Sequence, residues 1–168
     1  MSAARRLLIV GGIGLALLGM IYGVWYAVFA EHQELDGIGR SLTTGFSAAA
    51  KRDSAAADAA LKHYKELKYA YDRHVDVHSH WIGLAMVLIV LGIGLDRVNF
   101  SQQLKMFLAA GLLLGSLLFP LGVLIETFVH GPGPRVVAVA GSALVIGSLA
   151  GMTLGFVRDA KDLKREMR

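Results

Sequence analysis

The residues best suited to chemistry in this sequence are histidines and acids within the segment 72–80, which reads DRHVDVHSH. A long apolar stretch follows at once, so these ionisable groups stand at the start of a hydrophobic helix. Side chains four residues apart share a helix face, which pairs His74 with His78 and Asp76 with His80. Imidazole nitrogens and carboxylate oxygens in this arrangement are suited to binding a transition metal or a haem iron.

A second pair of this kind, Glu126 and His130, lies near the end of a later apolar stretch. A carboxylate inside a membrane-spanning helix is costly, and it usually faces the bundle interior with a partner. Two antiparallel neighbouring helices would bring this pair to the depth of the segment 72–80. We therefore predict an outward-facing metal site whose candidate ligands are His74, Asp76, His78, His80, Glu126 and His130.

These donors leave the identity of the ligand open. Histidine nitrogens with carboxylate oxygens suit zinc, iron or copper. A haem b would instead take axial histidines from among His78, His80 and His130. Either group would serve electron transfer or metal handling. The structural alternative is a polar clamp, in which Glu126 pairs with a histidine or Arg73 and the protein is a non-enzymatic membrane subunit or assembly factor.

The composition is that of a membrane protein. The 168 residues are 55% hydrophobic and 18% charged, with a mean hydropathy of +0.54, which is too apolar for a soluble domain. A bilayer core about 30 Å thick needs about 20 apolar helical residues. Four stretches meet this requirement, over about 7–30, 77–95, 106–129 and 136–157. We predict a single all-α domain, residues 1–168, built as a bundle of four transmembrane helices.

The apolar run of the first stretch is longer than the apolar core of a cleaved signal peptide. We therefore expect this stretch to stay in the membrane as a span.

The segment 31–76 is the only long stretch outside these spans, and its pattern predicts a helical hairpin. Apolar residues recur at intervals of three and four in 35–49, which indicates an amphipathic helix. Asp53 or Ser54 is a suitable N-cap for a second helix. Because neither Gly nor Pro separates that helix from the second span, we expect one continuous helix from about Ser54 to about Leu95.

Glycines recur every four residues in two of the predicted spans. The first span contains Gly19 and Gly23, and the fourth contains Gly147, Gly151 and Gly155. Small residues on one face let helices approach closely in lipid, so we expect these glycines to serve packing. The alternative is a flat cofactor lying against the glycine face.

Four aromatic residues stand near the outer ends of the first two spans: Tyr22, Trp25, Tyr26 and Trp81. Tyrosine and tryptophan are enriched where the hydrocarbon meets the headgroups. We therefore expect these side chains to form an aromatic belt and assign them no chemical role.

The basic residues predict the orientation. Arg5 and Arg6 precede the first span, Arg97 and Lys105 flank the connection after the second, and further Lys and Arg crowd the segment 158–168. By the positive-inside rule both termini should be cytoplasmic, in a bacterial inner membrane. The net charge of +4 then reflects topology, so nucleic acid is not an expected partner. The expected partners are the lipid bilayer and a membrane protein or another copy of the chain.

Several classes of chemistry are excluded or unsupported. The absence of cysteine excludes disulfides, thiolate metal sites, iron–sulfur clusters and covalently attached haem. The sequence contains no nucleophile–base motif, phosphate loop or dinucleotide-binding motif. We therefore expect a protein that is not an enzyme.

The motif His78-Ser79-His80, followed by Gly83 in an aliphatic run, carries a resemblance to known proteins. It resembles small bacterial multi-span membrane proteins that are distantly similar to subunit I of the haem-copper oxidases. In those oxidases such histidines ligate haem or copper, which implies axial ligation by His78 and His80. The first and fourth spans contain no histidine, so the resemblance does not imply oxygen reduction.

Overall fold

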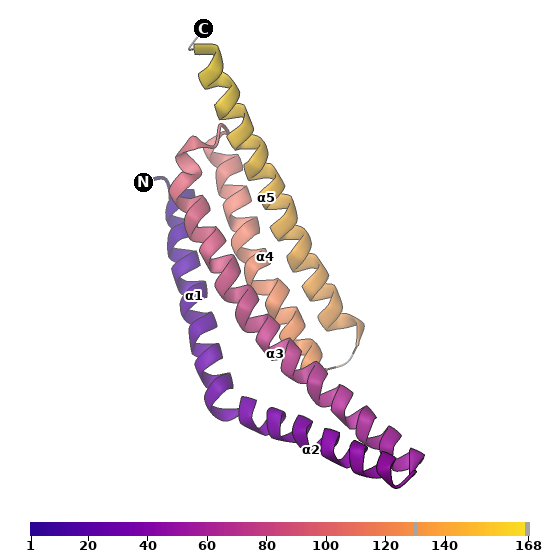
Figure 1. Cartoon of the computed structure of the whole chain (residues 1–168). Helices are drawn as coiled ribbons and strands as arrows, with labels where there is room; N and C mark the ends of the chain where they lie inside the picture. Colours follow the sequence, from indigo (N-terminus) through magenta and orange to yellow (C-terminus); the bar gives the residue numbers. More distant parts are fainter. Residues whose placement is uncertain (130, 167–168) are drawn as a thin grey trace.

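The computed structural model describes residues 1–129 and 131–166, with side chains as far as Ala160, and this part of the chain is almost entirely helical. The helices, drawn in Figure 1, are α1 (Ala3–Phe29), α2 (Glu31–Ala50), α3 (Ser54–Gly94), α4 (Gln102–Phe128) and α5 (Pro132–Glu166), with a 3-10 turn η1 (Leu95–Arg97) after α3. The prediction of an all-α four-helix bundle is confirmed.

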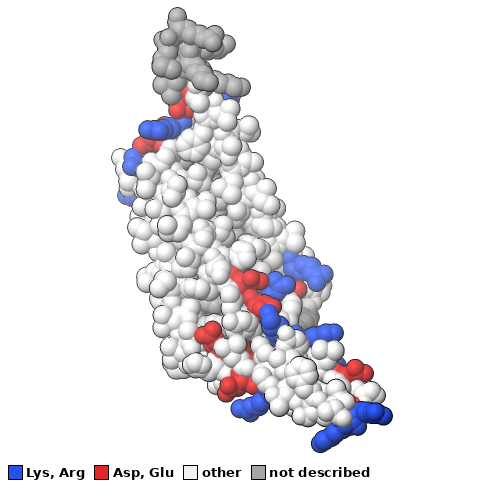
Figure 2. All heavy atoms as spheres, in the orientation of Figure 1, with Lys and Arg blue, Asp and Glu red and all other residues white. Residues whose placement is uncertain are grey.

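Four of the described helices, α1, α3, α4 and α5, are long and apolar enough to cross a membrane. Figure 2 shows that Lys, Arg, Asp and Glu gather toward the two ends of the visible face and leave a broad uncharged band between them. A hydrocarbon layer covers such a band at no electrostatic cost. The helices therefore indicate an integral membrane protein.

The helix α3 is one uninterrupted rod of 41 residues, as its sequence predicts. Its first half runs antiparallel to α2 and forms a hairpin that leaves the bundle obliquely, whereas its second half lies between α1 and α4 (Figure 1). The side chain of Asp53 caps α3 by accepting a hydrogen bond from the amide of Ala56 at 3.0 Å. The predicted cap and the predicted continuity are both confirmed.

The hairpin reverses direction through a Schellman motif at the end of α2. Arg52 adopts a left-handed conformation with φ of 59°, in the position that glycine usually takes. Its amide donates to the carbonyl of Ala49 at 2.9 Å, and the amide of Asp53 donates to Ala48 at 3.0 Å. These bonds satisfy the last carbonyls of α2 and let α3 begin two residues later.

The helix α2 packs against α3 through small side chains. Ser41 and Ala48 are buried in this interface. Phe46 and Leu42, which belong to the predicted apolar stripe, are 73% and 40% exposed. The helix is amphipathic as predicted, but most of its apolar stripe lies beside the contact with α3 rather than in it.

Within the bundle, α1 packs on α3, and α5 packs mainly on α4. Most of the recurring glycines stand where a neighbouring helix approaches. A Cβ at Gly19 would lie 3.0 Å from Ile82, and one at Gly151 would lie 2.7 Å from Leu108. Gly23 faces the ring of His78, so the packing interpretation is confirmed for Gly19, Gly23 and Gly151. Gly155 also packs closely, but against Val98 in the connection between α3 and α4.

Two glycines bring α4 and α5 together, backbone against backbone. A Cβ built at Gly141 would lie 2.4 Å from the amide nitrogen of Phe119, and one at Gly122 would lie 2.4 Å from that of Ala138. Backbone atoms cannot rotate away as a flexible side chain can. Glycine is therefore required at both positions by the spacing of the two helices.

We predict that Gly141→Ala destabilises the protein by about 1–3 kcal/mol, because the added methyl group must push two backbones apart. The matched control is Gly147→Ala on the same helix, where no atom lies within 4 Å of the new Cβ. Reversible unfolding in mixed detergent micelles measures both changes. Equal stability of the two variants would contradict the described contact of α4 with α5.

Candidate functional site

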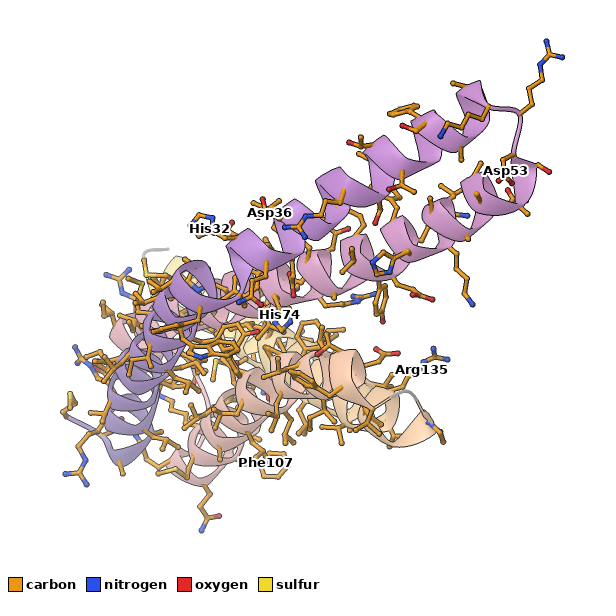
Figure 3. The ribbon with its side chains drawn as sticks, turned by 90° about the horizontal axis from the view of Figure 1, so that it is seen from below. His32, Asp36, Asp53, His74, Phe107 and Arg135 are labelled. Atoms are coloured by element: carbon orange, nitrogen blue, oxygen red, sulfur yellow. The ribbon has the colours of Figure 1, made fainter. Side chains whose placement is uncertain are left out.

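The structure gathers polar side chains where α1, α2 and α3 meet, at the root of the hairpin. The Nδ1 of His74 lies 2.5 Å from the hydroxyl oxygen of Tyr22, and its Nε2 lies 3.6 Å from a carboxylate oxygen of Glu34. The hydroxyl of Tyr26 donates to the other oxygen of Glu34 at 2.7 Å. We call these four residues the root cluster. Figure 3 shows His74 between the hairpin and the bundle.

Local geometry explains how α1 and α2 supply three members of the root cluster. Tyr22 and Tyr26 are four residues apart and so point from one face of α1. Only Ala30 separates α1 from α2, and its amide still donates to the carbonyl of Tyr26 at 3.0 Å. This sharp junction returns Glu34, one turn into α2, to the side of Tyr26.

Aromatic rings enclose the imidazole of His74, which is only 6% exposed. The ring of Tyr26 stacks on it with centroids 4.9 Å apart, and Phe128 of α4 approaches edge-on at 6.2 Å. Trp81 meets Tyr22 edge-on at 5.4 Å. Buried polar atoms destabilise the fold unless they form hydrogen bonds. The chain of contacts from Tyr22 through His74 and Glu34 to Tyr26 provides these partners.

The aromatic-belt prediction is wrong for most of the four residues to which it was applied. Tyr26 and Trp81 are buried, Tyr22 is half-buried, and Trp25 alone of the four is exposed. The physical reason is the hydrogen-bonding partner that each tyrosine finds. Both tyrosine hydroxyls bond to side chains of other helices, and these helices cover the rings.

The two histidines of the His-x-His motif face different helices. The Nδ1 of His78 lies 2.9 Å from the carbonyl oxygen of Gly19 on α1. The Nδ1 of His80 lies 2.6 Å from the carbonyl oxygen of Asp76, and its ring meets the edge of Phe119 on α4 at 4.8 Å. Residues two positions apart on a helix point in directions that differ by about 200°, so the rings of His78 and His80 cannot turn to one point.

The two predicted acidic ligands pair with arginines instead of histidines. Asp76 lies 3.6 Å from Arg73 one turn earlier on α3, and Glu126 lies 3.6 Å from Arg135 at the start of α5. Figure 3 shows Arg135 at an edge of the molecule well apart from His74. His130, the sixth predicted ligand, lies outside the described residues.

The predicted ligands therefore do not converge in the described part of the chain. Within it, no group of three or more His, Asp and Glu side chains lies close enough to hold a metal ion. The binding of haem or a metal stays a prediction. His78 is its most favourable remaining ligand, because its Nδ1 is held by a backbone carbonyl of another helix and its ring lines a surface groove.

Sequence reasoning missed three of the four members of the root cluster. The sequence predicts Tyr22 and Tyr26 to lie at the lipid interface and assigns no role to Glu34. One local pattern could have indicated part of this cluster. Tyr22 and Tyr26 share a face at the end of α1, and Glu34 follows within the first turn of α2. Their common partner His74 lies 52 residues from Tyr22, however, and no local pattern identifies such a pairing.

We predict that His74→Ala loosens the hairpin root. The change leaves the Tyr22 hydroxyl and one oxygen of Glu34 without their partner. An unpaired buried polar group costs about 1–3 kcal/mol, so amides of α2 should exchange with deuterium about tenfold to a hundredfold faster. Hydrogen–deuterium exchange read by mass spectrometry measures this. The control is His63→Ala, which changes an exposed histidine on the same helix. If His74→Ala left the exchange of the α2 amides unchanged, the prediction would be wrong.

Comparison with known proteins identifies no relative of this chain. Its sequence matches no model of a known protein family and no curated protein. Its fold matches no solved structure. The function therefore has to be inferred from the positions and contacts of the chain's own side chains.

Proposed function

We propose that this chain is a non-enzymatic membrane protein whose hairpin is a docking surface for a protein partner. The observation that carries the proposal is the exposed apolar stripe of α2, formed by Leu35, Leu42 and Phe46. On a segment outside the bundle, such a stripe costs free energy in water unless another surface covers it.

The shape of the hairpin supports a helical partner. A shallow groove of about 240 Å³ runs between α2 and α3, with Leu42 and Phe46 on one wall and Leu61 and Tyr64 on the other. Small residues such as Gly45 and Ala60 also line it. Two helices alone cover only one side of each other, and further helices laid in this groove would complete a small bundle.

The rigidity of the hairpin supports docking as well. The rod α3 joins the hairpin to the membrane without a break, and the root cluster attaches α2 to α1. The apolar stripe is thus presented in one direction relative to the bilayer. A surface ordered before binding loses less conformational entropy on association than a flexible one does.

Charge supports an orientation with the hairpin outside a bacterial inner membrane and both termini in the cytoplasm. The end of the bundle opposite the hairpin carries Arg5, Arg6, Arg97 and Arg158, and further Lys and Arg follow Arg158 in the sequence. Arginines and lysines close to the spans are retained on the cytoplasmic side. The hairpin then meets its partner, another membrane protein or a second copy of the chain, on the outer side.

We predict that a photo-crosslinking residue at Phe46 captures the partner in native membranes, whereas one at Ser47 does not. Ser47 is the matched control because it is also exposed but lies outside the apolar stripe. Leu42→Asp should abolish the adduct, because a carboxylate cannot be buried against an apolar surface. Mass spectrometry of the adduct distinguishes a second copy from another protein. Equal labelling from both positions, or none from Phe46, would contradict the proposal.

A second proposed function, the binding of haem b or a transition metal, is supported by His78. Because its Nδ1 donates to the Gly19 carbonyl at 2.9 Å, its Nε2 keeps a free lone pair. Histidines that ligate metals are usually held by such a bond on the other ring nitrogen. His78 also lines an outer groove of about 330 Å³ with Glu31, whose carboxylate is a further oxygen donor. A bound iron or copper would supply one-electron chemistry there.

We predict for this second function that protein purified from metal-replete cells carries a Soret band or stoichiometric metal. His78→Ala should lower the occupancy by at least about tenfold, because a lost ligand costs more than a lost outer-shell bond. Absorption spectra and elemental analysis measure the occupancy, with His63→Ala as the control. Colourless, metal-free wild-type protein would refute this function and leave the docking proposal standing.

A further inference from the structure

The contact between α1 and α4 is incomplete at the end of the bundle that holds the N-terminus. The two helices meet at Gly11, where a Cβ would lie 2.8 Å from Leu113. Nearer the N-terminus, two adjoining grooves of about 510 and 700 Å³ lie between them. Both grooves are lined by Ala3 of α1 and Met106 of α4, so they form one continuous depression, which we call the α1/α4 groove.

The lining of the α1/α4 groove changes from polar to apolar with depth. Arg6, Gln102 and Gln103 line it near the helix ends. One turn further into the span, the lining includes Val10 and Met106. Phe107, also part of the lining, is 74% exposed and points away from the bundle in Figure 3. A polar mouth above an apolar trough fits a molecule with a polar head and a hydrocarbon chain.

The charge at the mouth favours an anion. Arg5 is already paired with Asp96 at 2.7 Å, whereas Arg6 forms no ion pair with any described residue. The guanidinium of Arg6 is therefore available for phosphate oxygens, which arginine binds through two parallel hydrogen bonds. The N-terminal ends of α1 and α4 border the same mouth and add partial positive charge.

Because α1 and α4 are membrane-spanning helices, the α1/α4 groove opens onto lipid. We propose that it holds one anionic phospholipid, with an acyl chain along Leu7, Val10 and Met106 and the headgroup phosphate at Arg6. A basic pocket between transmembrane helices is a recurrent form of lipid headgroup recognition. This site lies at the opposite end of the bundle from the hairpin and is independent of both proposed functions.

Native mass spectrometry of the full chain, released from micelles with phosphatidylglycerol or with phosphatidylcholine of the same acyl chains, tests the proposal. We expect wild-type protein to retain one phosphatidylglycerol about tenfold more often than phosphatidylcholine, because only the former leaves the charge of Arg6 compensated. Arg6→Gln should remove this preference. Arg97→Gln, which changes an exposed arginine at the same end but outside the groove, should keep it.

A second variant tests whether the α1/α4 groove itself holds the lipid. Ala3 lines both halves near the mouth, so Ala3→Trp should block the groove there and reduce the retention of both lipids. Equal retention of the two lipids by wild-type protein, or an unchanged preference in Arg6→Gln, would overturn the proposal. The Arg6→Gln result is decisive even where Ala3→Trp does not fold.

Discussion

A buried imidazole must find hydrogen-bonding partners, and the arrangement of this molecule depends on how His74 meets that requirement. The ring lies at the meeting point of three helices and is enclosed by aromatic side chains. Its partners, Tyr22 and Glu34, come from two other helices. Because an unpaired polar group in such a place is costly, α2 is stable against the bundle only where Glu34 reaches His74 and Tyr26 together. The unbroken helix α3 sets the direction of the hairpin, and this pairing holds the start of α2 against the bundle.

The same helix geometry that forms the root cluster disperses the other candidate ligands. His74, His78 and His80 belong to one rod, yet each ring meets different neighbours. His74 faces the root of the hairpin, His78 faces the glycines of α1, and His80 faces Phe119 of α4. A rigid helix directs its side chains around its axis, so a cluster along the sequence is not a cluster in space. The proposed roles of these histidines are therefore separate.

The bundle keeps its two ends distinct. One end carries the hairpin, with a polar root and an exposed apolar stripe whose most exposed member is Phe46. The other end carries Arg6, which has no ion-pair partner among the described side chains, beside an apolar groove. Between the two ends, the helices pack tightly through the glycine contacts of α4 with α5 and of α1 with α3. The proposed protein partner at the first end and the proposed anionic lipid at the second would therefore use separate parts of the molecule.

The sequence by itself determined the class of protein, its four apolar helices, the continuity of α3 and the Asp53 cap. These features depend on length, hydropathy and neighbours within one helical turn, so local reasoning is sufficient for them. Only the tertiary structure decided that His74 pairs with Tyr22 and Glu34, and that α2 buries Ser41 and Ala48 rather than Phe46. Helical periodicity states which residues share a face, but the neighbour that this face meets comes from a distant part of the chain.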